Sequence, residues 1–246
     1  MIRKIYRSIL PERIRAAIRN LKKIMLRDRY ILIEYFFGVE RYPYKRYCDK
    51  YKCIFIHIPK NAGTSIITLL NDNNKIEQEH NLYWDYLRSD PSRFREYEKF
   101  CIVRNPWDRL LSGYEYLKDG GNKGSDKYLS DRVNRECESF YDFLMNWLTF
   151  DKIYNIKVLN PQFIYVYDMQ NERLILDNII RFESLNQGFT EMKKKLNIKG
   201  ELATLNRTKR KVYSELYTSQ MIERVAEFYA FDIKLFNYQF EIDNDT

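Results

Sequence analysis

The chain has 246 residues, of which 45% are hydrophobic and 31% are charged, a balance typical of a globular protein with a substantial core. Its formal net charge is +8, and residues 1–29 account for this surplus with ten Lys or Arg against two acidic residues. Because the rest of the chain is balanced, the charge does not support a nucleic-acid groove across the body. Four cysteines without a C-x-x-C pair, together with two histidines, argue against a structural zinc site and favour a reducing compartment.

The N-terminal segment is predicted to be a basic amphipathic helix, and we separate residues 1–40 from a main domain over 41–246. Such a helix either lies on an anionic membrane surface or packs on the body with its basic side in water. Charges recur too often for a signal peptide, and the apolar run 31–39 is too short to span a bilayer. One helical face carries the apolar residues Ile14, Ala17, Ile18, Leu21 and Met25.

A buried strand, a tight turn and a helix follow one another over residues 53–70. Residues 53–58 form a nearly continuous apolar run, typical of a strand buried on both faces, and Pro59 stops it. Residues 60–65 are a short polar turn, after which apolar residues return at helical spacing. In α/β proteins this arrangement directs backbone N–H groups and the positive end of a helix at a phosphate.

The residue types in this turn suit an anion. Gly63 permits close backbone approach or a positive φ, and the hydroxyls of Thr64 and Ser65 stand where helix caps belong. Lys60 brings a mobile positive charge to the mouth of the loop. The lysine precedes the glycine, unlike the order of the nucleoside-triphosphate loop, so this is a phosphate loop of another lineage. The alternative is an ordinary strand-to-helix turn with a capping threonine.

A second strand, residues 100–103, runs directly into Arg104 and a helix that contains Ser112. Open α/β sheets bind ligands at the carboxyl ends of their strands, which is where Arg104 stands. Arginine and serine could hold a second phosphate from two sides. Alternatively, Arg104 pairs with Asp108 or Glu115, and Ser112 is a small packing residue.

The order of strands and helices predicts an α/β fold with a central, mostly parallel sheet flanked by helices. Residues 118–135 contain three glycines and many charges, which is typical of a flexible insertion acting as a lid or an acceptor-side loop. The remaining predicted elements are a helix ended by Asp90-Pro91, a helix over 139–148, a strand over 179–183, a helix over roughly 184–196, and a last helix capped by Thr218.

Two segments, residues 55–65 (FIHIPKNAGTS) and 102–112 (IVRNPWDRLLS), resemble the signature segments of sulfotransferase family 2. This group includes carbohydrate sulfotransferases related to the heparan and chondroitin enzymes. The resemblance implies a P-loop-like three-layer α/β domain that uses 3′-phosphoadenosine 5′-phosphosulfate as donor, releases adenosine 3′,5′-bisphosphate and needs no metal. Asn61 stands where the family most often has threonine.

The resemblance also implies roles for individual residues. The first segment would hold the 5′-phosphosulfate, with Lys60 stabilising charge on the leaving phosphate, and Arg104 and Ser112 would hold the 3′-phosphate. Lys209 and Arg210, in a basic loop, would clamp the donor or an anionic acceptor, although such a loop is often only a solvated face. The donor-binding set is therefore Lys60, Asn61, Ala62, Gly63, Thr64, Ser65, Arg104 and Ser112.

The acceptor hydroxyl requires a general base, and histidine suits this role near neutral pH. His57 lies within the first strand, which favours a hydrogen-bonded core residue. His80 lies in the polar segment where related enzymes carry a catalytic histidine, so we predict it as the base. Glu77 and Glu79 are the reserve candidates.

Together these features predict an enzyme that transfers a sulfuryl group to a hydroxyl of a polysaccharide or glycolipid. The alternatives are a kinase-like phosphotransferase and a nucleotide-binding module that has lost catalysis. We expect a cytoplasmic protein, with residues 1–29 as a peripheral contact to the inner face of the membrane.

Overall fold

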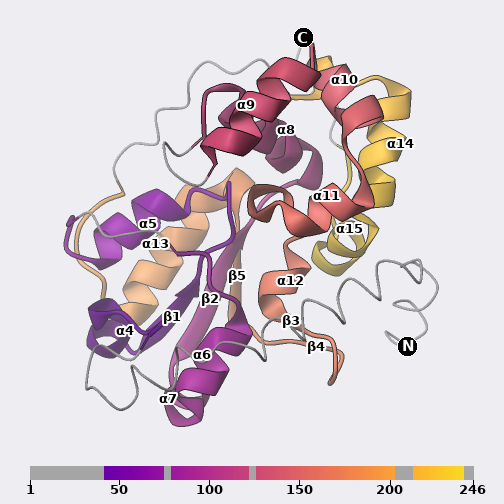
Figure 1. The fold of residues 1–246 in the computed structure, drawn as a ribbon. Helices are drawn as coiled ribbons and strands as arrows, with labels where there is room; N and C mark the ends of the chain where they lie inside the picture. Colours follow the sequence, from indigo (N-terminus) through magenta and orange to yellow (C-terminus); the bar gives the residue numbers. More distant parts are fainter. Residues whose placement is uncertain (1–41, 75–78, 122–125, 203–212, 241–246) are drawn as a thin grey trace. The chain divides into compact units, whose positions relative to one another are not determined.

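The computed structural model describes residues 42–74, 79–121, 126–202 and 213–240 (Figure 1). The described chain divides into two compact units. The first unit takes residues 42–103 and 162–202, and the second takes 104–161 and 213–240. Four predictions concern residues outside the described ranges: the amphipathic helix at 1–29, the reserve base Glu77, and the basic side chains Lys209 and Arg210.

The first unit contains a three-stranded parallel sheet. Its strand order is β1 (Cys53–Ile56), β2 (Glu98–Val103) and β5 (Asn178–Arg181), with β2 in the centre. Phe55 pairs with Phe100 across β1 and β2, and their ring centroids lie 5.0 Å apart. The predicted α/β fold with a parallel sheet flanked by helices is confirmed.

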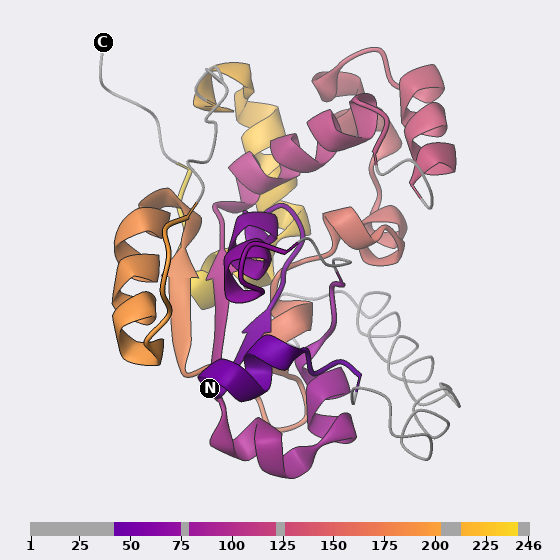
Figure 2. The same cartoon turned by 90° about the vertical axis from the view of Figure 1, so that its left-hand side faces the viewer.

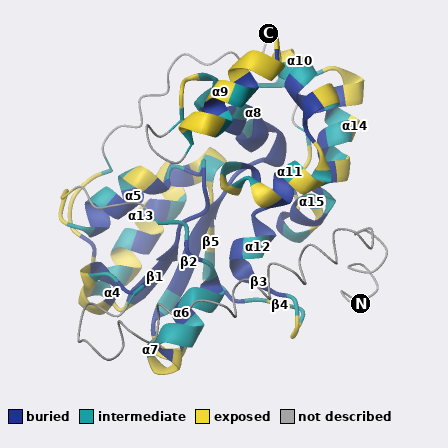
Figure 3. Cartoon of the chain, viewed as in Figure 1, coloured by how far each residue is buried: buried dark blue, intermediate teal, exposed yellow. Residues whose placement is uncertain are grey.

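Strands β1 and β2 are buried, and apart from Glu98 and Lys99 at the start of β2 their sequences are apolar on both faces. Every residue of β1 is buried, and in β2 only Glu98 is partly exposed (Figure 3). A strand covered on both sides needs this continuous pattern, since alternate polar residues would be removed from water without partners. The strand ends before His57, and Pro59 follows in the turn.

Short helices and a hairpin complete the first unit. A Cβ atom on Gly188 would lie 2.9 Å from Ile180 Cγ2, so α13 approaches β5 closely at this position (Figure 2). The short strands β3 (Tyr167–Asp168) and β4 (Arg173–Leu174) pair antiparallel. The helices are α4 (Arg46–Tyr51), α5 (Gly63–Leu70), α6 (Tyr83–Ser89), α7 (Pro91–Glu96), α12 (Phe163–Val166) and α13 (Leu185–Leu196), with a 3₁₀ turn at Phe182–Ser184.

The described part of the second unit is helical. The phenol of Tyr229 donates a hydrogen bond of 2.8 Å to the carbonyl of Leu159, and the buried guanidinium of Arg109 lies over the Tyr229 ring. The α-helices are α8 (Pro106–Lys118), α9 (Lys127–Glu136), α10 (Phe140–Asp142), α11 (Phe150–Asn155), α14 (Ser219–Phe228) and α15 (Ala230–Phe236). A π-helical turn at Phe143–Trp147 and 3₁₀ turns at Lys157–Leu159 and Tyr213–Leu216 join them.

Three local predictions in the second unit need correction. The expected flexible insertion contains α9, which buries Ser130 and Val133 and is therefore a packed helix. The helix expected over 139–148 begins as α10 and continues as the π-helical turn. Thr218 does cap α14, accepting from Met221 N at 3.4 Å, but α14 is followed by α15 and is not the last helix.

Among the described residues, no helix combines the length and apolarity needed to cross a bilayer.

All four cysteines, Cys48, Cys53, Cys101 and Cys137, are buried and none forms a disulfide. Burial raises the pKa of the Cys48 thiol to about 12 and that of Cys137 to about 11. Burial also raises the pKa values of Cys53 and Cys101 well above the ordinary thiol value. Because the thiolate is the reactive form, we expect these four thiols to have low reactivity in the folded protein.

We expect all four thiols to react slowly with Ellman's reagent at pH 8 in the native protein, and rapidly after denaturation. The raised pKa values suppress the thiolate and the packing blocks access, whereas unfolding removes both protections. A time course of thiol release, with and without guanidinium chloride, measures this. One thiol that reacts at once in the native state would contradict the burial described for it.

Candidate active site

The turn after β1 has an unusual backbone. Lys60 and Ala62 have φ values of 69° and 60°, in the left-handed region that non-glycine residues seldom enter. Turns that contain left-handed residues form concave arrays of N–H groups suited to anions. Gly63, directly after them, begins the eight-residue helix α5. The turn and the helix N-terminus therefore form a continuous backbone cradle of the kind that binds phosphate.

The helix caps differ from the prediction. The N-cap of α5 is Ala62, which makes no side-chain capping bond. Thr64 and Ser65 are the second and third helical residues, so neither is the N-cap expected from the sequence. The helix starts two residues earlier than a Thr64 cap would allow, because Gly63 already has helical backbone. A helix N-terminus without a side-chain cap offers its N–H groups to an external anion.

Asn61 anchors the turn from inside the first unit. Its side chain is 1% exposed, and Nδ2 donates to the carbonyl of Ile102 at 2.7 Å and to Gln162 Oε1 at 2.8 Å. Gln162 is itself fully buried. One amide thus ties the turn to β2 and to a residue about a hundred positions later in the chain. The sequence drew attention to Asn61 but did not identify either partner.

Gly63 is needed for space, not for a positive φ. A Cβ atom on Gly63 would lie 1.9 Å from Cδ2 of His57, far inside van der Waals contact. The His57 ring is 5% exposed and stacks on Phe55 with centroids 5.9 Å apart. His57 is therefore a core residue, as expected, but it also supports the turn through Gly63. Its position directly after an apolar strand gave no sign of this second contact.

His80 lies against His57 in the first unit. Their ring centroids are 4.2 Å apart, and His80 Nδ1 is 3.1 Å from the backbone oxygen of His57. Because a carbonyl oxygen can only accept, Nδ1 of His80 must carry the hydrogen of this bond. In the neutral ring Nε2 then has the lone pair and can take a proton. The predicted base thus lies beside the predicted phosphate turn, with a tautomer suited to that role.

Glu79, a reserve base, is engaged elsewhere. Lys45 Nζ is 3.2 Å from Glu79 Oε1, and Asn81 Nδ2 donates to Glu79 Oε2 at 2.9 Å. Both oxygens are therefore engaged in contacts that hold the carboxylate in place. His80 is the better placed of the two described candidates.

The second predicted segment begins where β2 ends. Arg104 follows Val103, and α8 starts at Pro106 with Asn105 as N-cap. Asn105 Oδ1 accepts from Trp107 N at 3.1 Å, and Pro106 suits the first helical turn because its missing N–H is not needed there. Arg104 Nε donates to Asp108 Oδ2 at 2.6 Å, which is the ion pair considered as an alternative from the sequence. Ser112 lies one turn further along α8 and is 6% exposed.

The structure thus distributes the predicted residues between the two units. The first unit brings together the turn at 60–65, His57, His80 and Gln162. The second unit brings together Arg104, Asp108 and Ser112. Taken separately, an uncapped helix end preceded by a lysine is a feature that suits a phosphate group, and so is an arginine that follows a strand. Within the described residues, no group of three or more His, Cys, Asp or Glu side chains forms a metal site.

The sulfotransferase family model matches residues 45–239, which is most of the chain. The match contains both predicted segments, 55–65 and 102–112, together with the strands β1 and β2 in which they begin. No curated protein sequence and no solved structure matches the chain significantly. The parallel sheet, the lysine-led turn before α5 and the arginine-led entry to α8 all fall within the matched residues, and the chain belongs to sulfotransferase family 2.

Proposed function

We propose that this protein transfers a sulfuryl group from 3′-phosphoadenosine 5′-phosphosulfate to a hydroxyl group of a carbohydrate. The observation that carries the proposal is the turn at 60–65, in a member of a sulfotransferase family. Its lysine precedes an uncapped helix N-terminus, and each of the two is a source of positive charge. Sulfuryl transfer needs this, because negative charge develops on the 5′-phosphate as it leaves.

The second segment accounts for the choice of donor. Arginine forms bidentate hydrogen bonds with phosphate, and a serine hydroxyl can add a third bond. Arg104 and Ser112 are the proposed ligands of the 3′-phosphate. ATP lacks a phosphate at this position, so these residues would favour the sulfuryl donor over ATP and argue against a kinase.

His80 is the proposed general base. The acceptor oxygen attacks sulfur while His80 Nε2 takes the hydroxyl proton, and the bond from sulfur to the 5′-phosphate oxygen breaks. The products are a sulfate ester, adenosine 3′,5′-bisphosphate and protonated His80. The bond from Nδ1 to the His57 carbonyl supports this role, since it fixes the tautomer and orients the ring.

The carbohydrate acceptor follows from the resemblance to the heparan and chondroitin enzymes. Lys209 and Arg210 are proposed to contact the donor or an anionic acceptor, and residues 1–29 to contact an anionic membrane surface from the cytoplasmic side. The charge of these segments supports both proposals.

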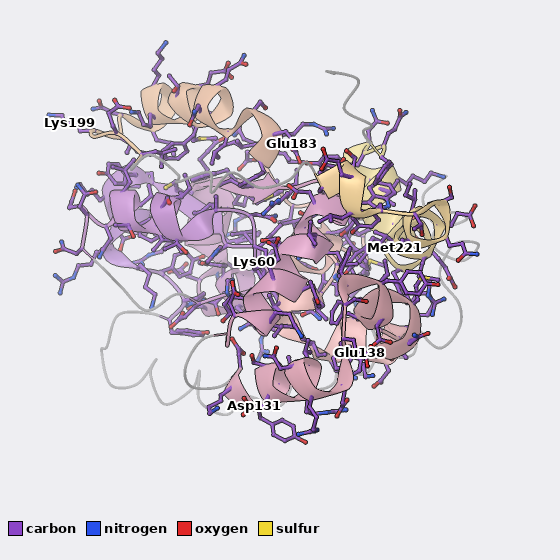
Figure 4. The ribbon with its side chains drawn as sticks, turned by 90° about the horizontal axis from the view of Figure 1, so that it is seen from above. Lys60, Asp131, Glu138, Glu183, Lys199 and Met221 are labelled. Atoms are coloured by element: carbon purple, nitrogen blue, oxygen red, sulfur yellow. The ribbon has the colours of Figure 1, made fainter. Side chains whose placement is uncertain are left out.

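The donor site is tested by titrating the protein with adenosine 3′,5′-bisphosphate, AMP and ATP by calorimetry, without metal. We expect the bisphosphate to bind tightest. Lys60→Ala and Arg104→Ala should each weaken it by about tenfold or more, because each removes a charge-assisted bond to phosphate. Lys199→Ala is the matched control, since Lys199 is an exposed lysine on the same unit as Lys60 (Figure 4).

Equal affinity for the bisphosphate and AMP in the wild-type protein would remove the basis of the proposed donor. Preference for ATP would favour the phosphotransferase instead. Binding without turnover over a broad panel of polysaccharides and glycolipids would favour the inactive module.

Two single substitutions, at residues 62 and 63, test the backbone cradle formed by the turn and the start of α5. Gly63→Ala should lower the free energy of unfolding by about 1–3 kcal/mol and weaken bisphosphate binding, because the new methyl group meets the His57 ring. Ala62→Gly should keep binding and fold at least as stably, since glycine tolerates the positive φ at this position. Chemical denaturation and calorimetry measure both. A Gly63→Ala protein with unchanged stability and binding would show that the close packing is not required.

His80→Asn tests the base while retaining a side-chain amide that can donate to the His57 carbonyl. We expect sulfate transfer from labelled donor to fall by at least about a hundredfold, with bisphosphate affinity unchanged, because proton removal is lost but the donor site is intact. Glu79→Gln is the comparison variant and should retain activity. Full activity in His80→Asn, or its loss in Glu79→Gln alone, would transfer the role to the glutamate.

A further inference from the structure

We infer that Asp108 is a positioning residue that holds the Arg104 guanidinium in the orientation needed to bind the donor's 3′-phosphate together with Ser112. This inference rests on the proposed function, which assigns the 3′-phosphate to Arg104 and Ser112. It adds a residue that does not itself touch the donor but determines how selectively the donor is recognised.

The contact that carries the inference is short and sheltered. Arg104 Nε lies 2.6 Å from Asp108 Oδ2, and the two side chains are 7% and 16% exposed. A charge-assisted bond of this length in a sheltered site holds its partners far more firmly than an exposed surface pair does. Asp108 takes the Nε hydrogen, and the guanidinium carries its other hydrogens on the two Nη atoms. These two nitrogens form the pair that binds phosphate in a bidentate manner.

The helix places Asp108 and Ser112 on one face. They stand four residues apart on α8, and Arg104 precedes Asp108 by the same interval. Side chains at this spacing are neighbours on a helix surface. Among the described residues, the Ser112 hydroxyl has no side-chain hydrogen-bond partner. The residue that holds Arg104 therefore lies one helical turn from Ser112 on the same face of α8.

The backbone around the pair is already held in place. Asn105 caps α8 and donates through Nδ2 to the carbonyl of Gln239 at 2.9 Å. Trp107 Nε1 donates to the carbonyl of Ile222 at 3.1 Å. The arginine side chain itself is long and can adopt many rotamers. The bond to Asp108 removes much of this freedom before a ligand arrives.

Orientation and charge predict opposite effects of changing Asp108. A carboxylate near a phosphate repels it, so if charge alone mattered, neutral substitutions would strengthen binding. If orientation dominates, losing the acceptor for Nε weakens binding. An amide oxygen can still accept the hydrogen bond from Nε. Asp108→Asn should therefore retain part of the 3′-phosphate affinity that Asp108→Ala loses.

The experiment measures dissociation constants for adenosine 3′,5′-bisphosphate and for AMP, and takes their ratio as the 3′-phosphate preference. We expect Asp108→Ala to reduce this preference by about tenfold, and Asp108→Asn to reduce it by less. Asp131→Asn is the matched control (Figure 4), because Asp131 also pairs with a cation four residues earlier, Lys127, on the same unit. Its preference should equal that of the wild type.

The double variant Arg104→Ala/Asp108→Ala shows whether Asp108 acts through Arg104. In the Arg104→Ala background, removing Asp108 should change the preference little. A fully additive further loss would overturn the positioning role. An unchanged or raised preference in Asp108→Ala would also overturn it, as would equal losses for the bisphosphate and AMP, which indicate a purely structural residue.

Failure of the inference is distinguishable from failure of the proposed function. If the wild type has no 3′-phosphate preference, the proposed function fails. If the wild type has it, Arg104→Ala loses it and Asp108→Ala keeps it, only the inference fails. If Asp108→Ala does not fold, Asp108→Asn distinguishes the two explanations. Loss of the negative charge alone would raise the 3′-phosphate preference, whereas weaker orientation of Arg104 would lower it.

Discussion

The strained backbone at residues 60–62 is the constraint on which the candidate donor site depends. A non-glycine residue with positive φ costs about 1–2 kcal/mol, and this turn contains two, Lys60 and Ala62. Such backbone persists only where buried contacts impose it. Asn61 supplies those contacts through two hydrogen bonds, and the His57 ring fills the space beside Gly63. Folding thereby fixes the backbone at the start of α5 in advance, so that the anion proposed to bind there would require little reorganisation.

The two cations proposed to bind the donor are suited to different tasks. Lys60 is a point charge on a flexible side chain, which can follow charge as it moves onto a leaving group. Arg104 is a planar fork held by Asp108 at 2.6 Å, which suits recognition of a group that does not change during the reaction. In the proposed function, Lys60 therefore serves the chemical step, and Arg104 serves the choice of donor.

Local and distant contacts explain why some elements were predictable and others were not. The strands β1 and β2, the start of α8 at Pro106 and the capping of α14 by Thr218 were predictable, because apolar runs, prolines and caps act within a few residues. The insertion at 118–135 was misread, because charges and glycines conceal two buried positions of α9, and their burial depends on packing. Thr64 and Ser65 were placed as caps because their types suit that role, although the helix begins before them.

By itself, the sequence determined the α/β class, the order of the two family segments and the identity of Lys60, Arg104, Ser112 and His80 as candidates. The fold class and the candidates Lys60, Arg104 and Ser112 follow from residue types at short spacing, whereas the choice of His80 rests on the resemblance to the family. Only the tertiary structure decided which side chains hold these candidates in place. The carbonyl of His57 sets the tautomer of His80 from 23 residues away, and Gln162 reaches Asn61 across 101 residues. The physical reason is that buried polar groups form hydrogen bonds with whichever groups the fold brings near them. When those partners are distant in the sequence, the local sequence pattern does not identify them.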